Sequence, residues 1–161
     1  MINKRWLWIV LALLTLTLLS AGCSSTPAQT VKETASAKQV LDENQTVIMT
    51  ADLTGGYSVE FASGAAYFYK GEAGEENEPI AFAYVISKEE YDSEIAYLTG
   101  EQTSDSEFKD LGNGLYSNGG ASGCDYFFPT EDGLYMKVAV EEAGMKEAES
   151  IYPRFSAHKD Q

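Results

Sequence analysis

The sequence predicts an α+β fold, in which a single antiparallel β-sheet of about six to seven strands has two helices packed on it. Short alternating segments are separated by glycine-containing turns, and strands joined in this way form hairpins. One segment begins with a helix cap and a second helical pattern lies near the C-terminus. Hairpin-linked strands give antiparallel sheets, so the order of elements favours α+β over α/β.

Four segments make up the first group of predicted strands. Residues Thr46–Leu53 alternate between apolar and polar positions. Tyr57–Phe61 and Ala65–Lys70 form a hairpin across Ala62-Ser63-Gly64. The run Ile80–Ile86 is apolar on both faces, which is typical of a central strand covered on both sides.

A helix is predicted directly after this central strand. Ser87 and Glu90 fit a capping box, in which each side chain hydrogen-bonds the backbone amide of the other residue. Gly100 is the expected end of the helix. The apolar stripe between them consists of Tyr91, Ile95 and Leu98.

Two further hairpins are expected before a final helix. Asn113-Gly114 is a hairpin turn between Phe108–Leu111 and Leu115–Ser117. A second turn joins Asp125–Phe128 to Leu134–Val140. The remaining segment, Glu141–Ser156, is predicted to be a helix that ends or kinks at Tyr152, because Pro153 follows.

The first residues have the features of an export signal. Lys4 and Arg5 precede an apolar run from Trp6 to Leu19, and small residues follow at Ser20-Ala21-Gly22. With Cys23 next, the pattern resembles the lipobox of bacterial lipoproteins, although Ser20 stands where that pattern usually has Leu. The resemblance implies cleavage before Cys23, S-diacylglycerylation of Cys23, and a protein held on the extracytoplasmic face of the cell membrane.

Two other readings of this segment remain open. The run from Trp6 to Gly22 is an uncleaved anchor in the first reading, but as a helix it is only ~26 Å long against a hydrocarbon core of ~30 Å. The second is an ordinary secretory signal, which leaves Cys23 unexplained. The expected organisation is a signal peptide over 1–22, a flexible tether over 23–45, an α+β domain over 46–157 and a tail over 158–161.

The charge of the chain limits its partners. The formal charge is −14, and loss of Lys4 and Arg5 with the leader makes it −16. Such a surface repels nucleic acid and anionic lipid headgroups, so no nucleic-acid partner is expected. The predicted partners are the membrane, through the lipid, and an envelope protein, peptide or glycan.

Nucleophilic and zinc chemistry lack the residues they need. A catalytic cysteine requires a base, and the one histidine, His158, falls in the predicted tail. One histidine and one spare cysteine do not supply a zinc site. With Cys23 lipidated, Cys124 is buried, free or in an intermolecular disulfide, and we expect burial beside Tyr126 and Phe128. No cofactor and no catalytic residue is predicted.

Carboxylates are the one abundant reactive group. Glycoside hydrolysis needs two of them facing each other across a cleft, and the candidates in or beside predicted strands are Asp52, Glu60, Asp110 and Asp125. The loop 72–78 is also acidic, but it lacks the pattern of an EF-hand, so a solvated loop is favoured over a calcium site.

The order of strands and helices resembles the PsbP-like arrangement, a twisted antiparallel sheet with helices packed on it. Fold likeness alone implies no activity. Our first functional hypothesis is a membrane-tethered binding or interaction module of the cell envelope, without evident catalysis. The alternative is a small extracytoplasmic hydrolase that uses paired carboxylates.

Overall fold

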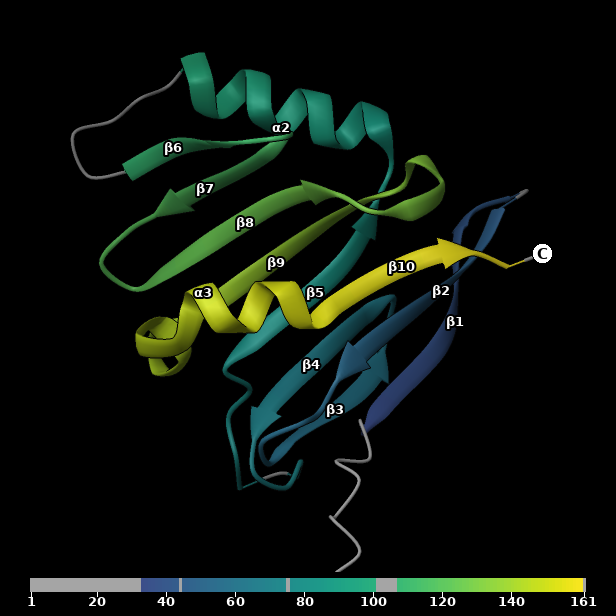
Figure 1. Cartoon of the computed structure of the whole chain (residues 1–161), viewed down its shortest axis with the longest axis vertical. Coiled ribbons are helices and arrows are strands. Elements are labelled where there is room, and N and C mark those ends of the chain that lie inside the picture. The colour runs from purple at the N-terminus through teal and green to yellow at the C-terminus, as the bar shows by residue number, and fades with distance from the viewer. Residues whose placement is uncertain (1–32, 44, 75, 101–106, 161) are drawn as a thin grey trace, which may run out of the picture. The chain divides into compact units, whose positions relative to one another are not determined.

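The strands form two antiparallel sheets, whereas a single sheet was expected. The computed structural model describes residues 33–43, 45–74, 76–100 and 107–160. The predicted signal peptide and Cys23 lie outside the described residues. The smaller sheet has the order β1-β2-β10 and the larger one β3-β4-β5-β9-β8-β7-β6 (Figure 1). The strands are β1 (Thr34–Asp42), β2 (Gln45–Asp52), β3 (Tyr57–Ala62), β4 (Ala65–Lys70), β5 (Ala81–Ile86), β6 (Glu107–Gly112), β7 (Leu115–Gly119), β8 (Gly123–Pro129), β9 (Tyr135–Glu141) and β10 (Phe155–Lys159).

The chain passes from the smaller to the larger sheet through one tight turn after β2. Tyr57 donates a backbone hydrogen bond to Leu53, and Gly55 and Gly56 in the turn both have positive φ. Glycine adopts this backbone conformation without the steric cost that a side chain brings. The turn therefore takes β3 out of the sheet that contains β2, so two sheets form where alternation alone predicted one.

A single core fills the space between the two sheets. Met49 of β2 and Phe68 of β4 are both fully buried, and the Phe68 ring meets Phe155 of β10 edge-on, with 5.1 Å between ring centres. Burying each such side chain contributes about 1.5–3 kcal/mol. The core also includes Val47, Ala51, Ala66, Ala81, Ala83, Val85, Tyr126, Leu134, Met136, Val138, Val140, Ala148, Ile151 and Ala157.

The N-terminal boundary of the domain differs from the expected one. Residues 34–42, assigned to the tether, form β1, which pairs along β2 with Ala37 opposite Met49. The side chains of β1 are mostly small, so its alternation carries little hydrophobic signal. Only the pairing with β2 shows which residues of β1 face inward. The described fold thus begins about ten residues after Cys23.

The C-terminal segment also differs from the single helix predicted there. It divides into two 3-10 helices flanking a short α-helix and then becomes β10, which pairs with β2. Pro153 lacks an amide and lies where the helical path ends, as expected. His158, assigned to the tail, belongs to β10. The helical pieces are η2 (Glu142–Glu147), α3 (Ala148–Ile151) and η3 (Tyr152–Arg154).

The helix α2 (Lys88–Gly100) confirms the capping box. Ser87 accepts a hydrogen bond from the amide of Glu90 at 3.1 Å, and the Glu90 carboxylate accepts one from the amide of Ser87 at 2.8 Å. Tyr91 packs against Tyr135, with 4.4 Å between ring centres, on the face of the larger sheet away from the core. Burial raises the pKa of Tyr91 to about 12. The helix therefore covers part of the outer face near β9.

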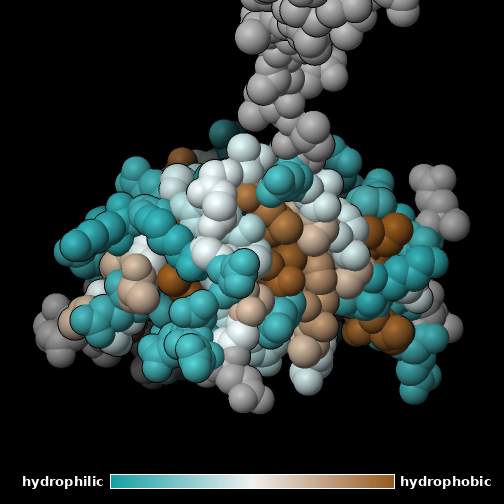
Figure 2. Space-filling model, turned by 90° about the horizontal axis from the view of Figure 1, so that it is seen from below, coloured by the Kyte–Doolittle hydropathy of each residue, from teal (hydrophilic) through white to brown (hydrophobic). Residues whose placement is uncertain are grey.

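The remaining strand predictions are confirmed at the level of elements. The three predicted hairpins correspond to β3–β4, β6–β7 and β8–β9. The strand predicted to be central is β5, which lies between β4 and β9. The face seen in Figure 2 carries a band of apolar residues between hydrophilic margins. None of the helices in the described residues is long and apolar enough to cross a membrane.

Candidate functional site

A large concave surface lies on the inner face of the larger sheet, as a groove beside strands β6, β7 and β8. Its volume is about 780 Å³, within the usual range for small-molecule sites. The smaller sheet packs against the core on this same inner face (Figure 1). We call this feature the β6–β8 groove. Its lining residues are Glu107, Lys109, Leu111, Leu115, Ser117, Gly119, Gly120, Ala121, Cys124, Tyr126, Met145, Glu149 and Tyr152.

Strand register places the floor of the groove. Lys109 of β6 pairs with Ser117 of β7, Ser117 pairs with Tyr126 of β8, and Tyr126 pairs with core residue Val138. Side chains directly opposite one another in a sheet lie on the same face. The floor of the groove thus lies beside the core on the same face of the sheet. In this region the strands extend beyond the residues that cover the core.

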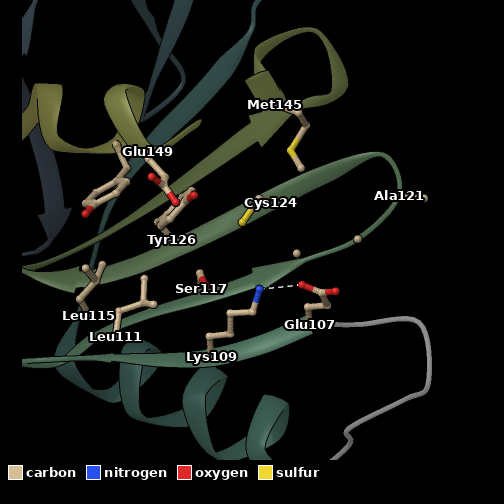
Figure 3. Close-up of a pocket in the computed structure, with 13 residues that line it drawn as sticks. Glu107, Lys109, Leu111, Leu115, Ser117, Ala121, Cys124, Tyr126, Met145 and Glu149 are labelled. Carbon is tan, nitrogen blue, oxygen red and sulfur yellow. Dashed lines mark hydrogen bonds and ion pairs between the residues drawn. The ribbon is translucent and has the colours of Figure 1, made fainter. Parts of the chain in front are cut away.

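The opposite wall comes from the helical segment η2–α3–η3. Met145 and Glu149 project from this segment toward the sheet, as Figure 3 shows. Tyr152 stacks on Tyr126, with 4.4 Å between ring centres and 20° between ring planes. Gly144 allows the helical wall to approach the backbone of Ile80 closely, because a Cβ at position 144 would lie 2.6 Å from the Ile80 carbonyl oxygen.

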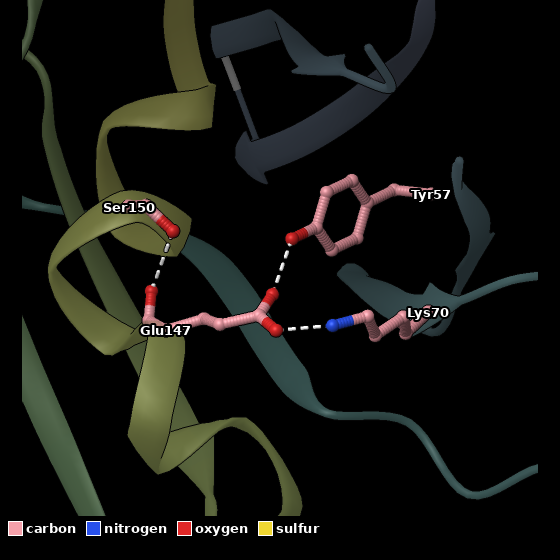
Figure 4. A network of polar contacts seen from close by, with 4 residues as sticks. All are labelled: Tyr57, Lys70, Glu147 and Ser150. Carbon is pink, nitrogen blue, oxygen red and sulfur yellow. Dashed lines mark hydrogen bonds and ion pairs between the residues drawn. The ribbon is translucent and has the colours of Figure 1, made fainter. Parts of the chain in front are cut away.

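A polar network ties this helical wall to the other end of the larger sheet (Figure 4). The Glu147 carboxylate accepts a hydrogen bond from the Tyr57 hydroxyl at 2.5 Å and forms an ion pair with Lys70. The Lys70 ammonium and the Tyr57 hydroxyl together lower the pKa of Glu147. Arg154 continues the network: its guanidinium lies over the Tyr57 ring and donates to the carbonyl of Thr54 at 2.8 Å. These contacts fix the wall relative to β3 and β4.

Cys124 lies on the groove floor and is half-buried rather than fully enclosed. As predicted, it shares a face with Tyr126 and Phe128 and packs against the core. Burial is the main cause of the raised pKa of its thiol, and the nearby Tyr126 hydroxyl opposes that shift. A thiol whose pKa is raised forms little thiolate at neutral pH, so its nucleophilicity is low.

The four carboxylates singled out in the sequence are not brought together as a pair. They lie on four different strands, and each is engaged by its own neighbour. Asp52 accepts hydrogen bonds from Thr54, Glu60 from the Tyr69 hydroxyl and Asp110 from the amide of Gly112, while Asp125 forms a 3.0 Å ion pair with Lys137.

The groove holds two other carboxylates, Glu107 and Glu149, which sequence reasoning did not select. They come from opposite walls (Figure 3). Lys109 bonds Glu107 at 2.6 Å and lowers its pKa. A general acid in a hydrolase needs a raised pKa, so the shift at Glu107 is opposite to the one that this role requires. No sequence signal marked these residues, because β6 and α3 meet only in the folded chain.

Metal binding finds no support in the described residues. They contain no group of three or more His, Cys, Asp or Glu side chains arranged to hold an ion. Glu75 of the acidic loop lies outside the described residues, and its neighbours Glu72, Glu76 and Glu78 are exposed. His158, on β10, does not line the β6–β8 groove.

Comparisons with models of protein families, with curated proteins and with solved structures found no match. The geometry of the chain itself is therefore what supports a function.

Proposed function

We propose that this protein is a lipid-anchored binding module of the cell envelope, and that its ligand occupies the β6–β8 groove. The observation that carries the proposal is the groove itself: a large concave surface with aliphatic, hydroxyl and charged groups on its floor and walls. Ligand sites commonly combine apolar lining with a few well-placed polar groups. The lipobox-like segment ending at Cys23 supports the anchor.

Binding is favoured over catalysis by the state of the reactive groups. The Cys124 thiol has a raised pKa, and a thiol needs a neighbouring base or a lowered pKa to act as a nucleophile. The Glu107 carboxyl has a lowered pKa and pairs with Lys109. A protein that holds its ligand without changing it needs neither group to be activated.

The anchor is tested by metabolic labelling with a palmitate analogue in intact cells. The parent protein and Cys124→Ala are expected to take up the label, and Cys23→Ala is expected to take up none. Two acyl chains give stable membrane attachment, whereas one gives only reversible binding. Cys124→Ala is the matched control, because it removes the other cysteine of the chain. Undiminished labelling of Cys23→Ala would overturn the anchor.

The groove is tested by site-specific photocrosslinking in intact cells, followed by mass-spectrometric identification of the products. The photoreactive residue replaces Leu111, which lies in the groove and is 49% exposed. The control replaces Val40 on β1, which is 76% exposed and outside the groove. The proposal predicts a defined product from position 111 and none of it from position 40. Identical products from both positions would show that the groove does not select a ligand.

A further inference from the structure

The floor of the groove carries a hydroxyl without a partner. Tyrosines apart, Ser117 is the one residue with a polar side chain that is buried in the described part of the chain, at 7% exposed. Its hydroxyl lines the groove (Figure 3) and forms no hydrogen bond with any other described residue. Among the described residues the one buried side-chain polar atom without a partner is Asn118 Oδ1, so the Ser117 oxygen is open to the groove. A hydroxyl oxygen placed in this way can accept a hydrogen bond from a ligand group that replaces water.

The charges around the groove leave one carboxylate in surplus. Lys109 and Glu107 neutralise each other as an ion pair at 2.6 Å. Glu149, on the opposite wall, forms no ion pair with a described residue, and its charge is felt by both Tyr126 and Lys109 across the groove. The excess negative charge on the exported chain adds to this field. The groove therefore favours a cation over an anion.

Apart from half-buried Tyr152, which stacks on Tyr126, the accessible apolar positions of the lining are aliphatic. Leu111 is 49% exposed, and Leu115 and Met145 are half-buried. The aromatic ring on the floor, Tyr126, is only 5% exposed and is stacked against Tyr152. Sugars pack against open aromatic faces, and Tyr126 does not present one. The lining thus suits a flexible hydrocarbon chain better than a glycan.

We infer that the β6–β8 groove takes an aliphatic ammonium group, of which the lysine side chain of an extended peptide is the natural example. The methylenes lie along Leu111 and Met145, and the ammonium donates to the Glu149 carboxylate and the Ser117 hydroxyl. This inference rests on the proposed function, since it names the ligand class of the same groove. A carboxylate ligand would meet the surplus charge of Glu149 with the wrong sign.

The test compares three blocked amino acids as probes of the full chain, labelled with ¹⁵N and held in detergent micelles. N-acetyl-lysine methylamide carries the ammonium, the norleucine analogue has a neutral chain of similar length, and the glutamate analogue carries the opposite charge. Binding is followed through the amide shifts of Gly119 and Gly120 at the rim. We expect affinity to fall in the order lysine, norleucine, glutamate, and the lysine affinity to fall as salt is added.

Two variants that each remove one carboxylate charge show which group binds the ammonium. Glu149→Gln keeps the shape of the wall and is expected to weaken lysine binding about tenfold, the loss of one charge-assisted hydrogen bond, while norleucine binding stays unchanged. Glu142→Gln removes the same charge from η2 outside the groove and should change neither probe. Ser117→Ala should weaken lysine binding by a smaller factor.

Each result has a distinct meaning. If norleucine or glutamate binds as tightly as lysine, or Glu149→Gln and Glu142→Gln behave alike, the groove binds ligands but the ammonium assignment is wrong. If none of the probes shifts the rim amides and photocrosslinking at position 111 also fails, the groove is not a binding site and the proposed function falls with the inference. If the probes fail while position 111 gives its defined product, only the ammonium assignment is overturned.

Discussion

Cys124 and Tyr126 alter each other's acidity, because they lie close together on one face of β8. Burial raises the pKa of both groups, and the proximity of Cys124 raises that of Tyr126 further. The two side chains therefore remain neutral at physiological pH. At the scale of the single residue, the part of the groove floor that β8 forms is therefore uncharged, whereas Lys109 on β6 and Glu149 on the helical wall carry charge.

This arrangement predicts slow alkylation of Cys124 in the native protein. In a Cys23→Ser background, the rate with iodoacetamide at pH 7 should be well below that of the same protein in urea, because the thiolate is the reactive form and burial disfavours it. The pH at which the native rate rises should lie above the ordinary range for cysteine. Equal native and unfolded rates at pH 7 would contradict this prediction.

Glu147 should make stability depend on acid pH. Lys70 and then Tyr57 lower the folded-state pKa of Glu147 below its ordinary value of 4.5. The contribution of Glu147 is complete above 4.5 and is lost as the pH falls through the lower folded-state pKa. Glu147→Gln should therefore be less stable than the parent at pH 7, and the difference should shrink below pH 4.5.

Urea unfolding at a series of pH values measures this difference. Glu76→Gln serves as the control, because it removes the same charge from an exposed loop. A gap between Glu147→Gln and the parent that stays constant from pH 7 to pH 3 would show that the Glu147 network does not titrate as described.

At the scale of elements, the sequence correctly predicted a helix cap and hairpin turns, because interactions between neighbouring residues determine them. Ser87 and Glu90 lie three residues apart and form the cap that their spacing indicated. The Asn113-Gly114 turn takes positive φ at both residues, as a two-residue hairpin requires. The helix expected over residues 141–156 was mostly wrong, because tight contacts with distant segments, such as that of Gly144 with Ile80, set the path there.

Replacing Gly144 with a larger residue should lower the free energy of unfolding. Its Cβ would lie 2.6 Å from the Ile80 carbonyl oxygen and 2.9 Å from Val140, so Gly144→Ala must push the helical wall away from the sheet. Overpacking of this kind typically costs about 1–3 kcal/mol of unfolding free energy. Gly74→Ala is the matched control, because nothing lies within 4 Å of its added Cβ. Thermal or urea unfolding that ranks the two variants alike would refute the contact.

At the scale of the whole chain, the sequence correctly predicted antiparallel strands with helices but not their division into two sheets. β1 alternates only weakly, and His158 lies near the C-terminus, so neither was predicted to be in a strand. Both are in strands because β1 and β10 pair with β2. The groove was equally hidden, because Lys109, Cys124 and Glu149 come from separate elements. Such features arise from contacts between segments far apart in the chain, and no local pattern encodes them.

Removal of β10 should prevent the domain from folding. Deleting residues 155–161 takes away Phe155, at 3% exposed, and Ala157, at 1% exposed, and leaves one edge of β2 without its paired strand. The truncated protein should bind a hydrophobic dye and be cleaved rapidly by protease. His158→Ala, on the same strand, should retain a cooperative unfolding transition. A cooperative transition in the truncated chain would show that β10 is dispensable.

The pairing of β2 with β10 also sets the order of events during biosynthesis. Arg154 contacts the backbone of Asp52 across 102 positions of sequence, and the strand that follows Arg154 completes the smaller sheet. Closing a loop of this length costs conformational entropy before the stabilising contacts between β2 and β10 can form, and this makes folding slow. We therefore expect the smaller sheet to remain incomplete until β10 has been synthesised. In the export that we propose for this protein, such a delay would favour the unfolded state in which a chain passes through a translocation pore.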